Sequence, residues 1–274
     1  MPNQSLTQID MACQAMNDGF FDYYENMVEY FHNNPSANLN YHAFASRTNR
    51  ATNALISEQE AIFYIVAYGW QHHQSVQHLL AETVDVTSNV QERIRLVDYG
   101  CGQGVATLAF MDYLAQKNVA KGRKLEVHLI EPSKVSLDIA KLLISRLAAV
   151  HGMAVTIHGQ QRQLDEALIP LNTSCGETFH LFSNVIDITA VQNALPQLAK
   201  QLKSCTGNNF LLANCPRYDQ TQIGFGLLHK HIDFSDSCYD KDWDITDETY
   251  RVLQARWGSH TSKQRLVALM WNGQ

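Results

Sequence analysis

The sequence lacks the features that would place the chain in a membrane or in a secretory compartment. Its 274 residues contain no apolar run close to the roughly 18 residues that a membrane-spanning helix needs. The first ten residues do not show a basic segment followed by an apolar block, which is the pattern of a secretion signal. We therefore expect a cytoplasmic protein that makes no membrane contact.

Paired cysteines are missing as well. The six cysteines stand at positions 13, 101, 175, 205, 215 and 238, and none of them forms the C-x-x-C pair of zinc ribbons and thioredoxin-like motifs. The run His229-Lys230-His231-Ile232-Asp233 contains metal-binding residue types but has no third, well-spaced ligand. The sequence therefore predicts reduced thiols and no bound metal.

Basic residues are scarce in the first third of the chain. Residues 1–90 contain nine acids, two arginines (Arg47 and Arg50) and no lysine, which gives a net charge of −7. A second acidic stretch runs from Asp219 to Glu248. Because polyphosphate partners are held by basic surfaces, a nucleic-acid substrate is disfavoured.

The sequence does contain enough apolar residues for a globular core, with 45% hydrophobic and 18% charged residues. An amphipathic, aromatic-rich helix is expected over residues 6–31 and should end at Asn33-Asn34-Pro35-Ser36. A second helix is expected from Ser57 to about Leu80, because Ser57-Glu58-Gln59-Glu60 has the form of a capping box.

From Arg93 onwards, short apolar runs alternate with helical stretches. The expected strands are Ile94–Asp98, Leu125–Glu131, Val155–His158, Phe179–Ser183 and Phe210–Ala213, and the expected helices are Gly104–Gln116, Val135–Val150 and Ala190–Lys203. Such alternation produces a parallel sheet that is covered on both faces. Two final runs, Tyr250–Arg256 and Arg265–Trp271, are separated by too few residues for a helical crossover, so we expect an antiparallel hairpin.

These patterns predict a doubly wound α/β fold. We expect a mostly parallel, seven-stranded sheet with a C-terminal antiparallel hairpin, preceded by an N-terminal helical cap. The expected regions are a cap over residues 1–90 and a sheet domain over residues 91–274. The cap would lie over the carboxyl ends of the strands, where open α/β sheets bind their ligands.

A glycine-rich loop follows the first expected strand. The segment reads Leu96-Val97-Asp98-Tyr99-Gly100-Cys101-Gly102-Gln103-Gly104 and leads directly into a helix. Glycine permits backbone angles that other residues avoid, and it lets a ligand approach the main chain closely. Glu131 ends the next strand, a position from which a carboxylate can accept both hydroxyl groups of a ribose.

This loop resembles the first motif of the class I S-adenosylmethionine (SAM) dependent methyltransferases, in which an acid precedes G-x-G-x-G. The dehydrogenase pattern G-x-G-x-x-G is not present, because positions 105 and 106 are Val and Ala. The hairpin after the fifth strand also resembles the methyltransferase pattern. The resemblance covers about residues 93–274 and implies SAM as the cofactor and S-adenosyl-L-homocysteine as its product.

Carried over by position, the resemblance implies a role for each matching residue. Asp98 would lie near the methionine end of SAM, the three glycines would form the floor, and Glu131 would hold the ribose. The segment after the third strand would face the adenine, although the usual acid is missing there, and Asn184 would either lie near the methyl group or cap the strand end. The expected cofactor-binding residues are Asp98, Gly100, Gly102, Gly104, Glu131, Ser133, Gly159, Gln160, Asn184 and Val185.

The motifs contain no fixed catalytic residue. The methyl group of SAM is already activated, so an enzyme mainly has to align the acceptor and exclude water. His72 and His73, on the second expected helix, are candidates for a general base or for ordinary packing. Arg47 is a candidate to hold a carboxylate or to form an ion pair inside the cap.

Both common signatures of base methylation are missing. After the fourth strand the sequence reads Asn184-Val185-Ile186-Asp187 in place of an Asx-Pro-Pro-aromatic box, and Cys215-Pro216 has the reverse order of the Pro-Cys pair used on cytosine. We therefore expect a methyltransferase whose small-molecule acceptor is enclosed under the cap. An RNA or protein methyltransferase and a non-catalytic SAM-binding partner protein stay open as alternatives.

Overall fold

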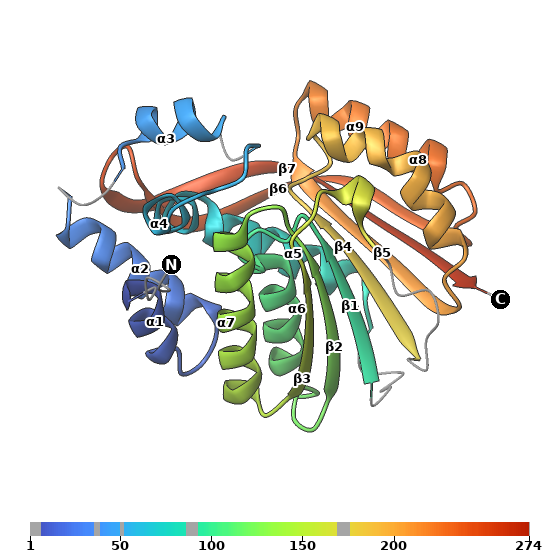
Figure 1. The fold of residues 1–274 in the computed structure, drawn as a ribbon, viewed down its shortest axis with the longest axis horizontal. Helices are drawn as coiled ribbons and strands as arrows, with labels where there is room; N and C mark the ends of the chain where they lie inside the picture. The colour runs from blue at the N-terminus through green and yellow to red at the C-terminus, as the bar shows by residue number, and fades with distance from the viewer. Residues whose placement is uncertain (1–6, 36–38, 50–51, 86–92, 169–175, 274) are drawn as a thin grey trace.

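A seven-stranded sheet forms the centre of the protein (Figure 1). The computed structural model describes residues 7–35, 39–49, 52–85, 93–168 and 176–273. The strands are β1 (Arg93–Tyr99), β2 (Lys124–Ile130), β3 (Ala154–Gln160), β4 (Glu177–Ser183), β5 (Gly207–Pro216), β6 (Ser237–Arg251) and β7 (Arg256–Gly273). They are arranged in the order β3-β2-β1-β4-β5-β7-β6. β1 to β5 are parallel, whereas β7 is antiparallel to both β5 and β6. The predicted fold class is confirmed.

Helices cover both faces of this sheet (Figure 1). α5 (Trp70–Thr83), α6 (Val105–Gln116) and α7 (Lys134–His151) pack on one face, and α8 (Thr189–Lys203) and α9 (Asp219–His231) pack on the other. Successive residues of β1 point to opposite sides, so Leu96 lies in the first core and Val97 in the second. This is why the central strands are buried along almost their whole length.

The N-terminal region contains more helices than the sequence pattern predicts. The helix expected over residues 6–31 is two helices, α1 (Thr7–Gln14) and α2 (Phe20–Asn33). They are separated because the Asp22 carboxylate accepts hydrogen bonds from the backbone nitrogens of Asn17 (2.9 Å) and Asp18 (2.8 Å), which fixes a turn before α2. α3 (Tyr41–Thr48) was not expected, and its signal is the N-cap Asn40, whose side chain accepts from the nitrogen of Ala43.

The second expected helix begins where it was predicted, since α4 (Glu58–Tyr64) is capped by Ser57. The capping box is only half formed, however. The Ser57 hydroxyl accepts from the nitrogen of Glu60 at 3.3 Å, but the Glu60 carboxylate accepts from the nitrogen of Ile56 and pairs with Arg47. The helix then continues into α5 through the π-helical segment η1 (Ile65–Gly69).

The C-terminal hairpin is confirmed, but its expected turn was wrong. The turn comprises residues 252–255 and contains Ala255 at φ 49°, whereas residues 257–264 belong to β7. Residues 256–262 pair with β6 alone and form a two-stranded ribbon that extends beyond β5 towards the N-terminal helices (Figure 1). One face of this ribbon is exposed, which explains its loop-like composition. On the packed side, the nitrogen of Tyr250 donates to the Tyr24 hydroxyl at 3.1 Å.

None of the helices in the described ranges has both the length and the apolar character needed to cross a membrane. Cysteines 13, 101, 205, 215 and 238 are free thiols, while Cys175 and Arg50 lie outside the described residues.

A buried polar network joins the N-terminal helices to the layer beside the sheet. The carboxylate of Asp112 on α6 lies 2.8 Å from His73 Nε2 and 2.7 Å from His151 Nε2, and it accepts from the nitrogen of Phe20 at 3.0 Å. His73 is stacked between the rings of Phe20 and Trp70. Burial alone would raise the pKa of Asp112, but the histidine hydrogen bonds outweigh it and lower the pKa.

We expect the substitution Asp112→Asn to lower the free energy of unfolding by about 2–4 kcal/mol, because it removes the charge that holds the buried His73 and the half-buried His151. Since the folded-state pKa is depressed, the contribution of Asp112 is present above its unfolded pKa and is lost as the pH falls through the folded value. Urea unfolding at pH 7 measures the change. The exposed Asp138, paired with Lys134, is the control, and Asp138→Asn should cost less than about 0.5 kcal/mol. Equal losses in both variants would contradict a structural role for the network.

Candidate functional site

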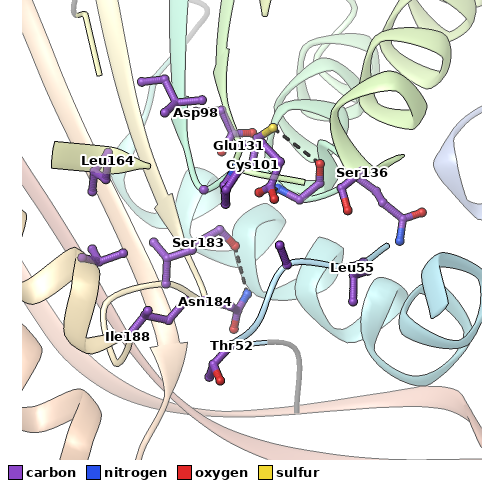
Figure 2. A pocket seen from close by; sticks show the side chains of 18 of the residues that line it. Thr52, Leu55, Asp98, Cys101, Glu131, Ser136, Leu164, Ser183, Asn184 and Ile188 are labelled. Atoms are coloured by element: carbon purple, nitrogen blue, oxygen red, sulfur yellow. Dashed lines mark hydrogen bonds between the residues drawn. The ribbon is translucent and has the colours of Figure 1, made fainter. Parts of the chain in front are cut away.

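A cavity of about 340 Å³ lies at the carboxyl ends of β1, β2 and β4 (Figure 2). The loop between β1 and α6 forms its floor, and the segments that follow β2 and β4 form its walls. The N-terminal segment Thr52–Leu55 covers it. The lining residues come from segments 52–55, 98–106, 130–136, 162–164 and 183–191, together with Tyr64 and His72.

The three loop glycines all have positive φ angles, but each position needs glycine for a different reason. A Cβ at Gly100 (φ 64°) would lie 2.9 Å from Val185 Cγ1, so this glycine permits the floor to contact the wall that follows β4. A Cβ at Gly102 (φ 52°) would meet no atom within 4 Å, and this residue lines the cavity. A Cβ at Gly104 (φ 78°) would lie 3.1 Å from Ala140 Cβ, so this glycine serves the packing of α6 on α7.

Two buried carboxylates face the cavity. Asp98 accepts a hydrogen bond from the Thr107 hydroxyl at 2.8 Å, and Glu131 accepts from the nitrogens of Ser133 (2.8 Å) and Gly102 (3.0 Å). Burial raises the pKa of both acids, and it raises the pKa of Asp98 to about 7. Among the residues that line the cavity, the one arginine or lysine is the exposed Arg162. The cavity therefore favours a ligand with positive charge.

Two side chains at the cavity present buried acceptors without a partner among the described residues. Asn184 (φ 56°) projects from the segment after β4 into the cavity, and its Nδ2 donates to the Ser183 hydroxyl, as Figure 2 shows. Its Oδ1 is buried and accepts no hydrogen bond, and the same is true of Gln103 Oε1. An unsatisfied buried acceptor costs about 1–3 kcal/mol, so a bound ligand with suitable donors would be stabilised here.

Hydrogen bonds join the covering segment to one wall of the cavity and α4 to its floor. The Ser133 hydroxyl donates to the carbonyl oxygen of Leu55 at 2.5 Å, and Gln103 Nε2 donates to the carbonyl oxygen of Ala61 at 2.9 Å. Ser133 also caps α7, because its hydroxyl accepts from the nitrogen of Ser136. These bonds connect Leu55 and the start of α4 to the carboxyl edge of the sheet.

Tyr64 and His72 line the cavity from opposite ends of η1. The Tyr64 hydroxyl lies 3.3 Å from His72 Nδ1, and the ring of Tyr68 stacks on His72 with 6.0 Å between ring centroids. Burial lowers the pKa of His72 to about 4, so its imidazole is neutral at pH 7. π-Helical segments often occur at functional sites, and this one brings both polar groups to one surface.

The structure brings together most of the expected site residues, but not all of them. Asp98, Gly100, Gly102, Glu131, Asn184, Val185 and His72 line the cavity, whereas Gly104, Ser133, Gly159, Gln160 and His73 do not. The Gln160 side chain instead bonds the backbone of Leu168, and Arg47 forms an ion pair with Glu60 inside the N-terminal region. His229 pairs with Asp240 at 2.8 Å.

Sequence reasoning missed the covering segment, Tyr64, Leu164 and Ile188, which also line the cavity. They reach it through tertiary contacts, and no local motif distinguishes them from ordinary loop or helix residues.

Comparison with known proteins returns structures only: no family model and no curated protein matches this chain. One solved structure is a precorrin-6y C5,15-methyltransferase from Geobacter metallireducens GS-15, with 11% identity, a TM-score of 0.41, and coverage of 73% of this chain and 86% of that chain. Another is a SAM-dependent O-methyltransferase from Thermotoga maritima, with 15% identity, a TM-score of 0.39, and coverage of 82% and 70%.

A third is a putative O-methyltransferase from Klebsiella pneumoniae, with 13% identity, a TM-score of 0.40, and coverage of 84% of this chain and 98% of that chain. At these identities and TM-scores, the likenesses assign neither a family nor an activity to this chain. The resemblance to class I methyltransferases therefore depends on the chain itself, on its glycine loop and on the sheet order that ends in the antiparallel hairpin.

The buried position of Asp98 leads to a prediction about stability. A folded-state pKa raised to about 7 means that the stability associated with Asp98 is lost as the pH rises towards and through 7. The difference in the free energy of unfolding between Asp98→Asn and the wild type should change by about 2 kcal/mol in favour of the variant when the pH is raised from 5 to 8. Urea unfolding at both pH values measures this difference.

The exposed Asp244 supplies the control, and Asp244→Asn should show no such trend. A difference between Asp98→Asn and the wild type that stays constant with pH would contradict the burial of an ionising carboxyl group at position 98.

Proposed function

We propose that this protein is a SAM-dependent methyltransferase that acts on a small-molecule acceptor. The observation that supports this most is that one cavity is lined by two buried carboxylates and by Gly102, where an added Cβ would meet no atom within 4 Å. SAM carries a positive sulfonium and a positive ammonium group, which suits a cavity lined by Asp98 and Glu131. When bound, SAM would supply an activated methyl group.

Residues of the floor and of both walls have roles in this proposal. Asp98 holds the ammonium end, the backbone at Gly100 and Gly102 lies against the cofactor, and Glu131 accepts the ribose hydroxyls. Asn184 offers its unpartnered Oδ1 to a donor of the cofactor or the acceptor. Gly159 and Gln160 have no part in it, because Gln160 is engaged by the backbone of Leu168.

The covering segment favours an acceptor of small size. Thr52–Leu55 lines the cavity and is hydrogen-bonded to Ser133 through Leu55, so the acceptor has to fit beside an attached segment. In this proposal residues 1–90 act as the cap and residues 91–274 as the cofactor-binding domain. The cap also excludes water from the transfer, which is the main contribution a protein makes to this chemistry.

His72 is the proposed proton acceptor on the acceptor side. Its imidazole is neutral at pH 7, faces the cavity, and is oriented by Tyr64. A neutral imidazole accepts a proton from a hydroxyl or amine as that group becomes methylated. His73 is proposed to have a structural role only.

Incubation with methyl-labelled SAM and a metabolite extract tests the proposed activity. We expect a labelled product of low molecular weight. Label found only in RNA or protein would overturn the small-molecule acceptor, and SAM binding without turnover on any acceptor would favour a non-catalytic partner protein.

Gly102→Ala tests the cofactor site against a matched control, Gly122→Ala. Both glycines have positive φ angles and no atom within 4 Å of an added Cβ, but only Gly102 lines the cavity. Each variant should lose about 1 kcal/mol of stability through backbone strain. Calorimetry should show that SAM binding weakens at least about tenfold in Gly102→Ala, the equivalent of 1.4 kcal/mol, and is unchanged in Gly122→Ala. Equal binding in both variants would place the cofactor elsewhere.

His72→Gln and His73→Gln distinguish the two neighbouring histidines once an acceptor is known. We expect His72→Gln to lower kcat about 100-fold while SAM binding stays the same, because a general base contributes that much or more. His73→Gln should lower the free energy of unfolding and leave the kcat of the folded protein unchanged. A kcat for His72→Gln equal to that of the wild type would exclude His72 as the proton acceptor.

A further inference from the structure

A second group of polar side chains lies away from the cavity, on strands β2 and β3. Glu126 and His128 alternate along β2 and so point to the same face of the sheet. His158 is the cross-strand partner of His128 on β3. Leu125 and Val127 point the other way, into the core beneath α7. The three polar side chains therefore share the face of the sheet opposite α7.

The possible ligand atoms of this group lie close together. His128 Nε2 is 2.9 Å from Glu126 Oε1, and the rings of His128 and His158 stack with centroids 4.6 Å apart. One ligand atom from each of the three residues lies within 4.8 Å of the others. Two ligand atoms bound to one zinc ion in tetrahedral geometry are roughly 3.3 Å apart. Small side-chain movements therefore suffice to place three ligand atoms around one ion.

We propose that Glu126, His128 and His158 form a binding site for a divalent transition-metal ion of the zinc class. Two imidazoles and one carboxylate are ligands that zinc prefers, whereas calcium and magnesium prefer sites made of oxygen atoms alone. Binding of the ion through His128 Nε2 would break the contact with Glu126 Oε1 and leave the single proton of the neutral imidazole on Nδ1. The fourth position is open to solvent, because His158 is exposed.

Two arginines hold Glu126 from the other side. Arg93 contacts Glu126 Oε2 at 2.8 Å, and Arg95 contacts Oε1 at 3.0 Å. Partners of this kind orient a metal-binding carboxylate and fix its geometry. Their positive charge also opposes the ion, so the affinity depends on the two imidazoles. This dependence makes His158 the decisive residue.

The site would connect β3 to β2 at the edge of the sheet. β3 pairs with β2 alone among the described strands, and its side chains are mostly exposed or half-buried. In the described part of the connection from β3 to β4, the one helical element is the 3₁₀ turn η2 (Leu164–Glu166). A metal ion bound there stabilises the native state by mass action, independently of any cofactor in the cavity.

Calorimetric titration of zinc chloride into the full chain, prepared without a polyhistidine tag, tests this proposal. We expect one zinc ion per chain and a rise in the thermal midpoint with zinc concentration. His158→Ala should weaken binding by at least about tenfold and abolish the rise. The metal-free variant should keep its stability, because His158 is exposed.

His42→Ala is the matched control, since His42 is an exposed histidine on α3, away from β2 and β3. It should bind zinc as the wild type does. His128→Gln, a second ligand variant, should lose binding as His158→Ala does. The proposal is overturned if the wild type shows no one-to-one binding, or if His158→Ala binds zinc with wild-type affinity.

Discussion

The burial of negative charge at the carboxyl end of the sheet is the constraint on which the site depends. Asp98 and Glu131 are removed from water by the glycine loop, the walls and the N-terminal cover. Three hydrogen bonds, from Thr107, Ser133 and Gly102, offset only part of the desolvation, which is why both pKa values remain raised. A cationic ligand would supply the missing compensation, so the features that destabilise these carboxylates in the free protein are the ones that favour such a ligand.

The sheet and the floor of the cavity could be predicted from sequence because their signals are local. β1, β2 and β4 are buried on both faces, and the glycine spacing at 100, 102 and 104 is set by backbone conformation. The turn of the C-terminal hairpin was misplaced because the ribbon is exposed on one side and therefore has the composition of a loop. The break between α1 and α2 depends on the single carboxylate of Asp22, which a periodicity argument does not detect.

The covering segment and the positions of Tyr64 and His72 could not be predicted in the same way. Leu55 reaches the cavity through a hydrogen bond to Ser133, which is 78 positions away in the chain. Tyr64 and His72 share a surface only because five residues between them form a π-helix, and the sequence pattern gives no sign of that segment. The adjacent histidines 72 and 73 then diverge: one faces the cavity, and the other pairs with Asp112.

The ribbon of β6 and β7 joins the two ends of the chain, since Tyr24 and Tyr250 are hydrogen-bonded across 226 positions of sequence. During synthesis the N-terminal helices leave the ribosome first, yet they obtain this contact only after the last two strands have been made. The rings of Phe21 and Tyr24, which pack on Trp257, consequently lack this partner until β7 has been synthesised. Truncation of the C-terminal ribbon should therefore weaken the packing of a helix that lies far away in the sequence.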